Sequence, residues 1–251
     1  METKSFYVEP MKNYLGISAL IASVTFGAAS AAAERPIVVE LFTSQGCSSC
    51  PPADALLREL ATHDDVLALT LPVNIWDYLG WRDTLATSAF TERQRNYVAH
   101  LGGRSVYTPQ MVIDGVTDAV GSRVGHVTRA IELRREMKSN DVPIRFSHDN
   151  NTVTITVGAD ASGKEATLWL IRYVKATPVT IERGENAGET ITYANVVREM
   201  TPIGMWKGGV ITLNLPTSSL IAQGYDGCAA ILQENGDGAI LGAAVLDMTT
   251  L

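Results

Sequence analysis

The feature that most constrains this chain is Cys47-Ser48-Ser49-Cys50, a pair of cysteines that Pro51-Pro52 follows directly. An apolar, β-branched run at 37–42 precedes the pair and an amphipathic stretch at 53–63 follows it, so the pair lies at a strand-to-helix turn. Prolines suit the first helical turn, and the free N–H groups and dipole of a helix N-terminus stabilise a thiolate. The pattern favours dithiol/disulfide chemistry, with Cys47 as the attacking residue and Cys50 as the resolving one.

Two other uses of the pair remain open, namely a structural disulfide and half of a metal site. A metal site needs further Cys or His ligands at matched spacing. No metal site is predicted, because the remaining candidates show no such spacing: His63, His100, His126, His148 and Cys228. We expect Cys228, which enters an apolar run, to be a small buried hydrophobe, although an odd cysteine in an exported protein can also form exchange disulfides.

The N-terminus predicts export through a signal peptide at 1–33. Met11-Lys12 precedes an apolar run at 15–29, and small residues follow at 29–33, with cleavage expected after Ala31 or Ala33. The run is shorter than the ~20 residues that span a bilayer. Acidic residues at positions 2 and 9 make Met11 an alternative start. We expect a periplasmic or secreted protein without stable membrane insertion after cleavage; an uncleaved membrane anchor is the alternative.

The formal charge of −7 excludes one class of partner. The expected signal peptide carries two basic and two acidic residues, so the mature chain keeps this charge. An acidic surface without basic clusters repels phosphate backbones. We therefore predict no nucleic-acid partner.

Hydrophobic periodicity predicts two domains, at 34–140 and 141–251. The first has the order β-α-β-α-β-β-α, with Thr91 and Ser122 as helix caps and a hairpin turn at Asp114-Gly115. Its expected strands are 37–42, 66–73, 110–113 and 117–120, and its expected helices are 53–63, 91–101 and one after Ser122. The order predicts a mixed sheet with helices on its faces. In the second domain, short β-branched runs predict a mostly antiparallel β domain, with strands at 144–146, 152–157, 167–173, 210–215, 229–233 and 240–246.

Four segments together resemble a bacterial secreted family called domain of unknown function 1223. They are 38–54, 76–81, 107–110 and 184–188, and the resemblance runs from about Pro36 to the C-terminus. That family is placed in the thioredoxin-like superfamily, which implies an α/β thioredoxin-like first domain. The resemblance also implies that Thr108-Pro109, with a cis proline, faces the cysteine pair and docks a substrate backbone. No Trp precedes Cys47 and no Gly-Pro separates the cysteines, so neither redox potential nor direction carries over.

Three further positions are candidates near the pair. Trp76 and Tyr78 follow the second strand, where ligands bind in open α/β sheets, and they line either a groove beside Cys47 or a packed loop. Asp77 is a candidate acceptor for the Cys50 proton. Asn186 lies in a loop that either forms a simple turn or folds over the pair and restricts its partners.

We therefore expect an exported thiol-disulfide oxidoreductase that acts on protein thiols and disulfides. It needs no diffusible cofactor, but it needs a separate redox partner to regenerate it. One alternative is a non-catalytic binding or interaction protein with a structural disulfide, and a weaker alternative is a copper(I)-handling protein.

Overall fold

The structure is a computed structural model that describes residues 1–4, 35–137, 141–221 and 224–251. Contacts divide the chain into two units, Met1–Ala33 and Glu34–Leu251, and the second contains all the helices and strands described. The expected signal peptide lies almost entirely outside the described residues, as does residue 140, where the expected first domain ends. Within the described parts of the chain, no helix is long and apolar enough to cross a membrane.

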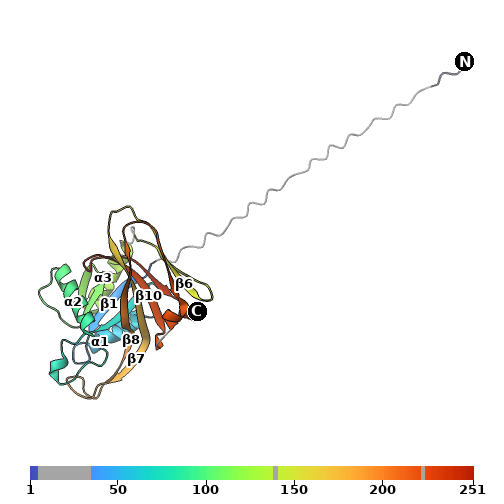
Figure 1. The fold of residues 1–251 in the computed structure, drawn as a ribbon. Coiled ribbons are helices and arrows are strands. Elements are labelled where there is room, and N and C mark those ends of the chain that lie inside the picture. The colour runs from blue at the N-terminus through green and yellow to red at the C-terminus, as the bar shows by residue number, and fades with distance from the viewer. Residues whose placement is uncertain (5–34, 138–140, 222–223) are drawn as a thin grey trace. The chain divides into compact units, whose positions relative to one another are not determined.

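Strands outnumber helices in the described chain (Figure 1). In chain order the elements are β1 (Ile37–Thr43), α1 (Pro51–Leu60), β2 (Val66–Pro72), η1 (Asp77–Leu79), α2 (Ser88–His100), β3 (Gln110–Ile113), β4 (Thr117–Val120), α3 (Val124–Glu136), β5 (Ile144–His148), β6 (Thr152–Val157), β7 (Ala166–Thr180), β8 (Thr190–Trp206), β9 (Ile211–Pro216), α4 (Thr217–Ile221), β10 (Gly227–Glu234), β11 (Ile240–Leu246) and η3 (Met248–Thr250).

The expected fold class, an α/β thioredoxin-like domain followed by a separate β domain, is wrong. The chain forms one eight-stranded mixed sheet in the order β11-β10-β7-β8-β2-β1-β3-β4 and a three-stranded antiparallel sheet in the order β5-β6-β9. The large sheet takes strands from both halves of the sequence, because β8 pairs in parallel with the open edge of β2 at Thr70 and Val196. An edge strand has unpaired backbone groups, and β8 covers this edge of β2 with one backbone pairing.

A side chain strengthens this junction between β2 and β8. Asn195 of β8 has a positive φ of 45° and donates its side-chain amide to the carbonyl of Ala68 at 2.8 Å. Asn tolerates the left-handed conformation better than most residues because its short polar side chain bonds nearby backbone. The single backbone pairing is thereby supplemented where the two strands meet.

Two predicted helix caps are wrong. Thr87, not Thr91, is the N-cap of α2, and its hydroxyl accepts the backbone N–H of Phe90. Thr91 lies within the helix and donates its hydroxyl to Asn74 at 2.8 Å. Arg123, not Ser122, is the N-cap of α3. In contrast, the hairpin predicted at Asp114-Gly115 is confirmed, since β3 and β4 pair across it.

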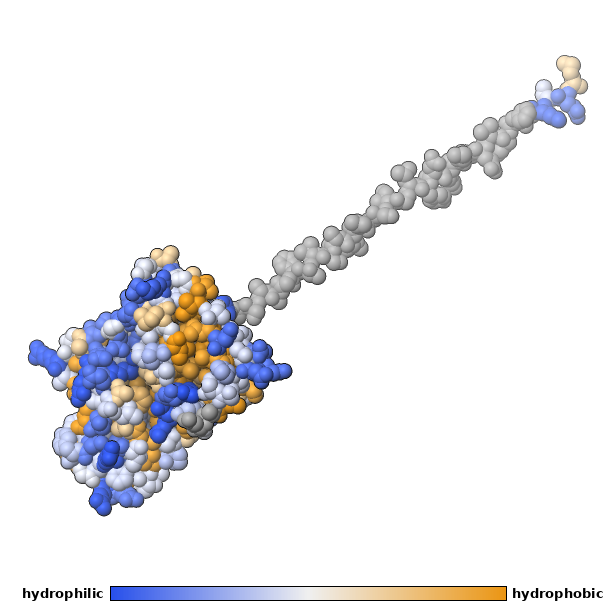
Figure 2. All heavy atoms as spheres, in the orientation of Figure 1, coloured by the Kyte–Doolittle hydropathy of each residue, from blue (hydrophilic) through white to orange (hydrophobic). Residues whose placement is uncertain are grey.

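Apolar side chains fill both faces of the large sheet. Leu57 of α1 and Ile131 of α3 belong to the cluster that contains Leu41 of β1. Phe90 and Tyr97 of α2 belong to a second cluster. A third cluster joins β5, β6 and β9 to strands from the C-terminal half of the large sheet. Figure 2 shows that apolar side chains also reach the surface on the displayed face, among hydrophilic ones.

Candidate functional site

The two cysteines form a disulfide at the turn between β1 and α1. Cys50 is the N-cap of α1, and prolines occupy the first two helical positions, where their missing N–H groups cost little. Cys50 is fully buried and Cys47 is 5% exposed, whereas Ser48 and Ser49 between them are exposed. A partner approaching from solvent therefore meets Cys47 before Cys50.

The Thr108-Pro109 segment lies beside this turn. Its peptide bond is cis. The Ser49 hydroxyl lies 3.4 Å from Cys47 Sγ and donates to the carbonyl of Thr108 at 3.4 Å. Trp76 donates its indole N–H to the Thr108 hydroxyl at 2.7 Å. The structure thus brings three of the predicted residues, Thr108, Pro109 and Trp76, to the cysteine turn.

The loop between β7 and β8 covers the same turn. Asn186 is buried and donates its side-chain amide to the carbonyls of Gln45 and Cys47, each at 2.9 Å. The Glu185 carboxylate accepts the backbone N–H of Ser48 at 3.2 Å. A loop about 140 positions further along the chain therefore holds the backbone on both sides of Cys47.

Tyr78 and Asp77 lie at the edge of this arrangement. The Tyr78 side chain is 74% exposed, and its ring centroid is 6.1 Å from that of Trp76. Asp77 is half-buried and accepts the backbone N–H of Asp83 at 3.1 Å, which orders the 77–83 loop. Among the described residues, Asp77 makes no hydrogen bond to Cys50. Both Asp77 and Asp83 line a cavity of about 750 Å³.

The acidic residue adjacent to Cys50 is Asp54, which the sequence did not single out. Asp54 lies in the first turn of α1, where its backbone N–H donates to the Cys50 carbonyl at 3.1 Å. It is 3% exposed, and neither carboxylate oxygen has a hydrogen-bond partner in the described structure. Burial raises the pKa of Asp54 to about 7 and the charge of Asp83 adds to the rise. The nearby Thr43 hydroxyl opposes it, although neither group meets the geometry of a hydrogen bond.

Two more buried polar groups accompany Asp54. Burial also raises the pKa of Asp83, although this carboxylate accepts the backbone N–H of Gln45 at 2.8 Å and two more from its own loop. Burial and the charges of Asp54 and Asp83 raise the pKa of Tyr193 on β8. The first turn of α1 thus holds a buried carboxyl group, close in sequence to Cys50, whose pKa lies near neutral pH.

Neither Cys228 nor a metal ligand set belongs to the site. Cys228 lies on β10, fully buried, and burial raises the pKa of its thiol to about 12 despite the opposing charge of Arg172. A thiol with that pKa is a poor nucleophile at neutral pH. In the described part of the chain, no three His, Cys, Asp or Glu side chains form a group that could hold a metal ion.

Different signals could have revealed the residues that were missed. Asp54 follows Cys50 by four positions, so both lie on one helix face. A carboxylate within an otherwise apolar helix face can be recognised in the sequence and indicates a candidate functional residue. Glu185 has no such signal, because its contact with Ser48 depends on the packing of a distant hairpin.

The sequence and the fold of the chain can be compared with those of known proteins. Residues 38–233 match the family described as "Protein of unknown function (DUF1223)". The chain belongs to this family. A crystal structure of protein AGR_C_4864, a structural-genomics target from Agrobacterium tumefaciens, is 35% identical and has a TM-score of 0.73. The similarity covers 85% of this chain and 94% of that chain. No curated protein sequence matches significantly.

A second solved structure resembles the fold alone. It is described as HBP35 of Porphyromonas gingivalis and is 14% identical, with a TM-score of 0.53. The similarity covers 86% of this chain and 76% of that chain. At this level of identity the likeness concerns the arrangement of elements and carries no information on function.

Proposed function

We propose that this DUF1223 protein is a thiol-disulfide oxidoreductase that acts on protein partners through Cys47 and Cys50. The observation that carries the proposal is the disulfide at the N-terminus of α1 with the buried, unpaired carboxyl group of Asp54 one turn away. A structural disulfide needs no such acid. Exchange can use one, because each resolving step moves a proton that a nearby acid of matched pKa can accept.

In the reducing direction, the Cys47 thiolate attacks one sulfur of a partner disulfide. A bond forms between Cys47 and that sulfur, and the partner's other sulfur leaves as a thiolate. Cys50 then transfers its thiol proton to Asp54 and attacks Cys47 Sγ, which expels the second partner thiolate. Two electrons pass from the cysteine pair to the partner, and the reverse sequence oxidises a partner dithiol.

The surrounding residues have positioning roles in this proposal. The segment at Thr108-Pro109 and the rings of Trp76 and Tyr78 present the surface on which an extended partner segment docks beside Cys47. Asn186 and Glu185 hold the cysteine turn from the opposite hairpin and limit which partners reach Cys47. A second dithiol or disulfide protein regenerates the pair, and no diffusible cofactor takes part.

The proposed location is the periplasm or the exterior of the cell. A disulfide persists in oxidising compartments, and the N-terminal sequence has the pattern of a signal peptide.

A structural disulfide in a binding protein is the second candidate. The low exposure of both sulfurs favours it, because Cys50 is fully buried and Cys47 nearly so. The two candidates differ in one consequence. Only a redox-active pair passes through a mixed disulfide with a partner protein as a step of its own reaction.

Trapping tests the difference directly. In a Cys50→Ser variant expressed in its native compartment, Cys47 cannot be released from a mixed disulfide, so we expect covalent adducts that reducing agent removes. Cys47→Ser should give no adducts, and adding Cys228→Ser to Cys50→Ser should leave them unchanged because Cys228 is buried. An absence of adducts with Cys50→Ser would favour the structural disulfide.

A further inference from the structure

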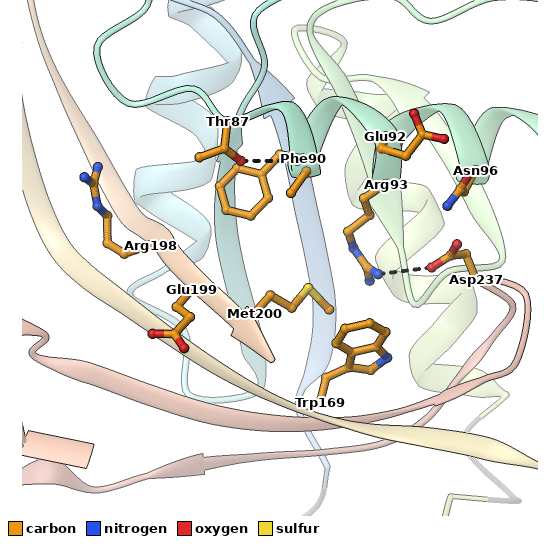
Figure 3. A pocket seen from close by; sticks show the side chains of 11 residues that line it. Thr87, Phe90, Glu92, Arg93, Asn96, Trp169, Arg198, Glu199, Met200 and Asp237 are labelled. Carbon is orange, nitrogen blue, oxygen red and sulfur yellow. Dashed lines mark hydrogen bonds and ion pairs between the residues drawn. The ribbon is translucent and has the colours of Figure 1, made fainter. Parts of the chain in front are cut away.

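A second cavity lies between α2 and the β7–β8 hairpin, and it shares no lining residue with the disulfide site. Its volume is about 560 Å³, within the ~300–1,000 Å³ of small-molecule sites. Figure 3 shows Phe90 projecting from α2, with Trp169 and Met200 rising toward it from the strands. These side chains make an apolar interior that suits a flat hydrophobic group.

The charged side chains that line this cavity are paired, with one exception. Arg93 pairs with buried Glu40 at 2.7 Å and with Asp237 at 3.3 Å. Glu92 pairs with Arg95, and Glu199 with Arg172. Within the described residues, only the Arg198 side chain lacks both a hydrogen bond and an ion pair among the charged groups of the lining.

The backbone explains why Arg198 lies at the cavity. Along the β7–β8 pairing, Arg172 is opposite Glu199 and Tyr173 is opposite Val197, so Arg198 is the extra residue of a β-bulge. A bulge redirects the side chain of its extra residue out of the alternating pattern. Figure 3 shows Arg198 at one end of the cavity and the Arg93–Asp237 pair at the other.

We propose that this cavity binds a small organic anion, a monocarboxylate with a flat apolar body. The carboxylate would pair with the Arg198 guanidinium, whose planar fork matches a carboxylate bidentately. The apolar body would lie among Phe90, Trp169 and Met200. The paired charges at the opposite end leave no second free cation there, so the site favours one anionic group over two.

Isothermal titration calorimetry with 2-naphthoate tests the proposal on the oxidised protein. We expect saturable binding at one site, roughly tenfold weaker for Arg198→Gln because a charged hydrogen bond is lost. Arg145→Gln is the matched control, since Arg145 is an exposed arginine of β5 outside the cavity. The uncharged analogue 2-naphthamide should bind at least tenfold more weakly than 2-naphthoate. Met200→Trp should abolish binding by filling the cavity.

Three results would overturn the proposal. They are no saturable binding at millimolar 2-naphthoate, equal affinity for 2-naphthamide, and an affinity that Arg198→Gln leaves unchanged. If Met200→Trp does not fold, the Arg198→Gln variant still tests the proposal. The Arg198 side chain is exposed, so this variant should fold and its far-UV circular dichroism should match that of the wild type. Since the cavity and the disulfide share no residue, this test is independent of the Cys50→Ser trapping.

Discussion

Asp54 combines two properties that seldom occur together in a carboxyl group without a function. It is almost completely buried, and neither oxygen has a hydrogen-bond partner in the described structure. An unsatisfied buried polar group costs about 1–3 kcal/mol, so an apolar residue would stabilise this position. The pKa of about 7 is the property that such a residue would lack.

Asp54→Asn should slow the resolving step, because an amide cannot take the Cys50 proton. In the wild type we expect the exchange rate to rise with pH around 7. In the variant we expect a rate roughly a hundredfold lower and no inflection of the pH profile near 7. Stopped-flow reaction of the reduced protein with a small aromatic disulfide measures both.

Asp77→Asn is the control for this experiment. Asp77 bonds the backbone of Asp83 and makes no described hydrogen bond to Cys50, so the variant should keep the wild-type rate and pH profile. Two results would contradict an acid-base role for Asp54. They are an unchanged pH profile of the exchange rate in Asp54→Asn, and loss of that pH profile in Asp77→Asn.

Asp54 should also make stability depend on pH. Its pKa is about 7 in the folded protein and ~3.9 when unfolded, so the folded state holds the proton more tightly. The associated stability is fully present below pH ~4 and is lost as the pH rises through about 7, by on the order of 3–4 kcal/mol. Urea denaturation of the oxidised protein should show this decline, and Asp54→Asn should lack it. Parallel declines in both proteins would contradict the assignment.

At the scale of elements, the hairpin loop between β7 and β8 holds the cysteine turn through hydrogen bonds. Asn186 satisfies two backbone carbonyls, and Glu185 satisfies one N–H of the same turn. Three hydrogen bonds from a single loop hold the backbone around Cys47 in place. Removing them should loosen the turn without disturbing the sheet.

Asn186→Ala should expose Cys47 in the reduced protein. We expect alkylation of Cys47 by iodoacetamide to accelerate several-fold, because the carbonyls of Gln45 and Cys47 lose their buried partner. Asn151→Ala, at an exposed turn, is the control and should leave the rate unchanged. Equal alkylation rates and an equal range of trapped partners in Asn186→Ala and wild type would remove the gating role.

Local elements could be predicted from the sequence, whereas pairing between distant strands could not. The strand before Cys47 and the Asp114-Gly115 hairpin have short-range signals, and both are present. β8 escaped detection because Asn195, Arg198 and Pro202 interrupt any two-residue alternation. The fold class was wrong for this reason, since β8 is the strand that joins the two halves of the large sheet.

The residues of the candidate site also fall into two groups, those that could be predicted from the sequence and those that could not. Cys47 and Cys50 carry their chemistry in their spacing, and the family resemblance identified Thr108-Pro109. Asp54 was missed because burial, not residue type, gives it its pKa. Glu185 was missed because its contact with Ser48 exists only after β7 and β8 pair.

At the scale of the whole described molecule, one sheet connects the cysteine turn to the C-terminal strands. β2 and β8 meet through one backbone pairing and the Asn195 side chain. The three-stranded sheet shares an apolar cluster with β7, β8, β10 and β11. The strand that precedes the cysteine turn and the C-terminal strands therefore belong to one sheet.

The continuous sheet predicts that residues 34–251 unfold in a single transition. Two double variants separate the tryptophan fluorescence of the two parts of the molecule. Trp169→Phe/Trp206→Phe keeps only the tryptophans near the cysteine turn. Trp76→Phe/Trp81→Phe keeps only those of the β7–β8 hairpin. We expect each variant's urea curve by fluorescence to coincide with its own curve by far-UV circular dichroism. Separate midpoints within one variant would show that the two halves unfold independently.

The most direct test of the redox proposal is an equilibrium titration of the protein from Glu34 onward, with Cys47 and Cys50 followed by alkylation and mass. If the pair is redox-active, its potential should lie between about −120 and −270 mV, the range of exchange catalysts. A potential below about −300 mV would mark a structural disulfide and contradict the account.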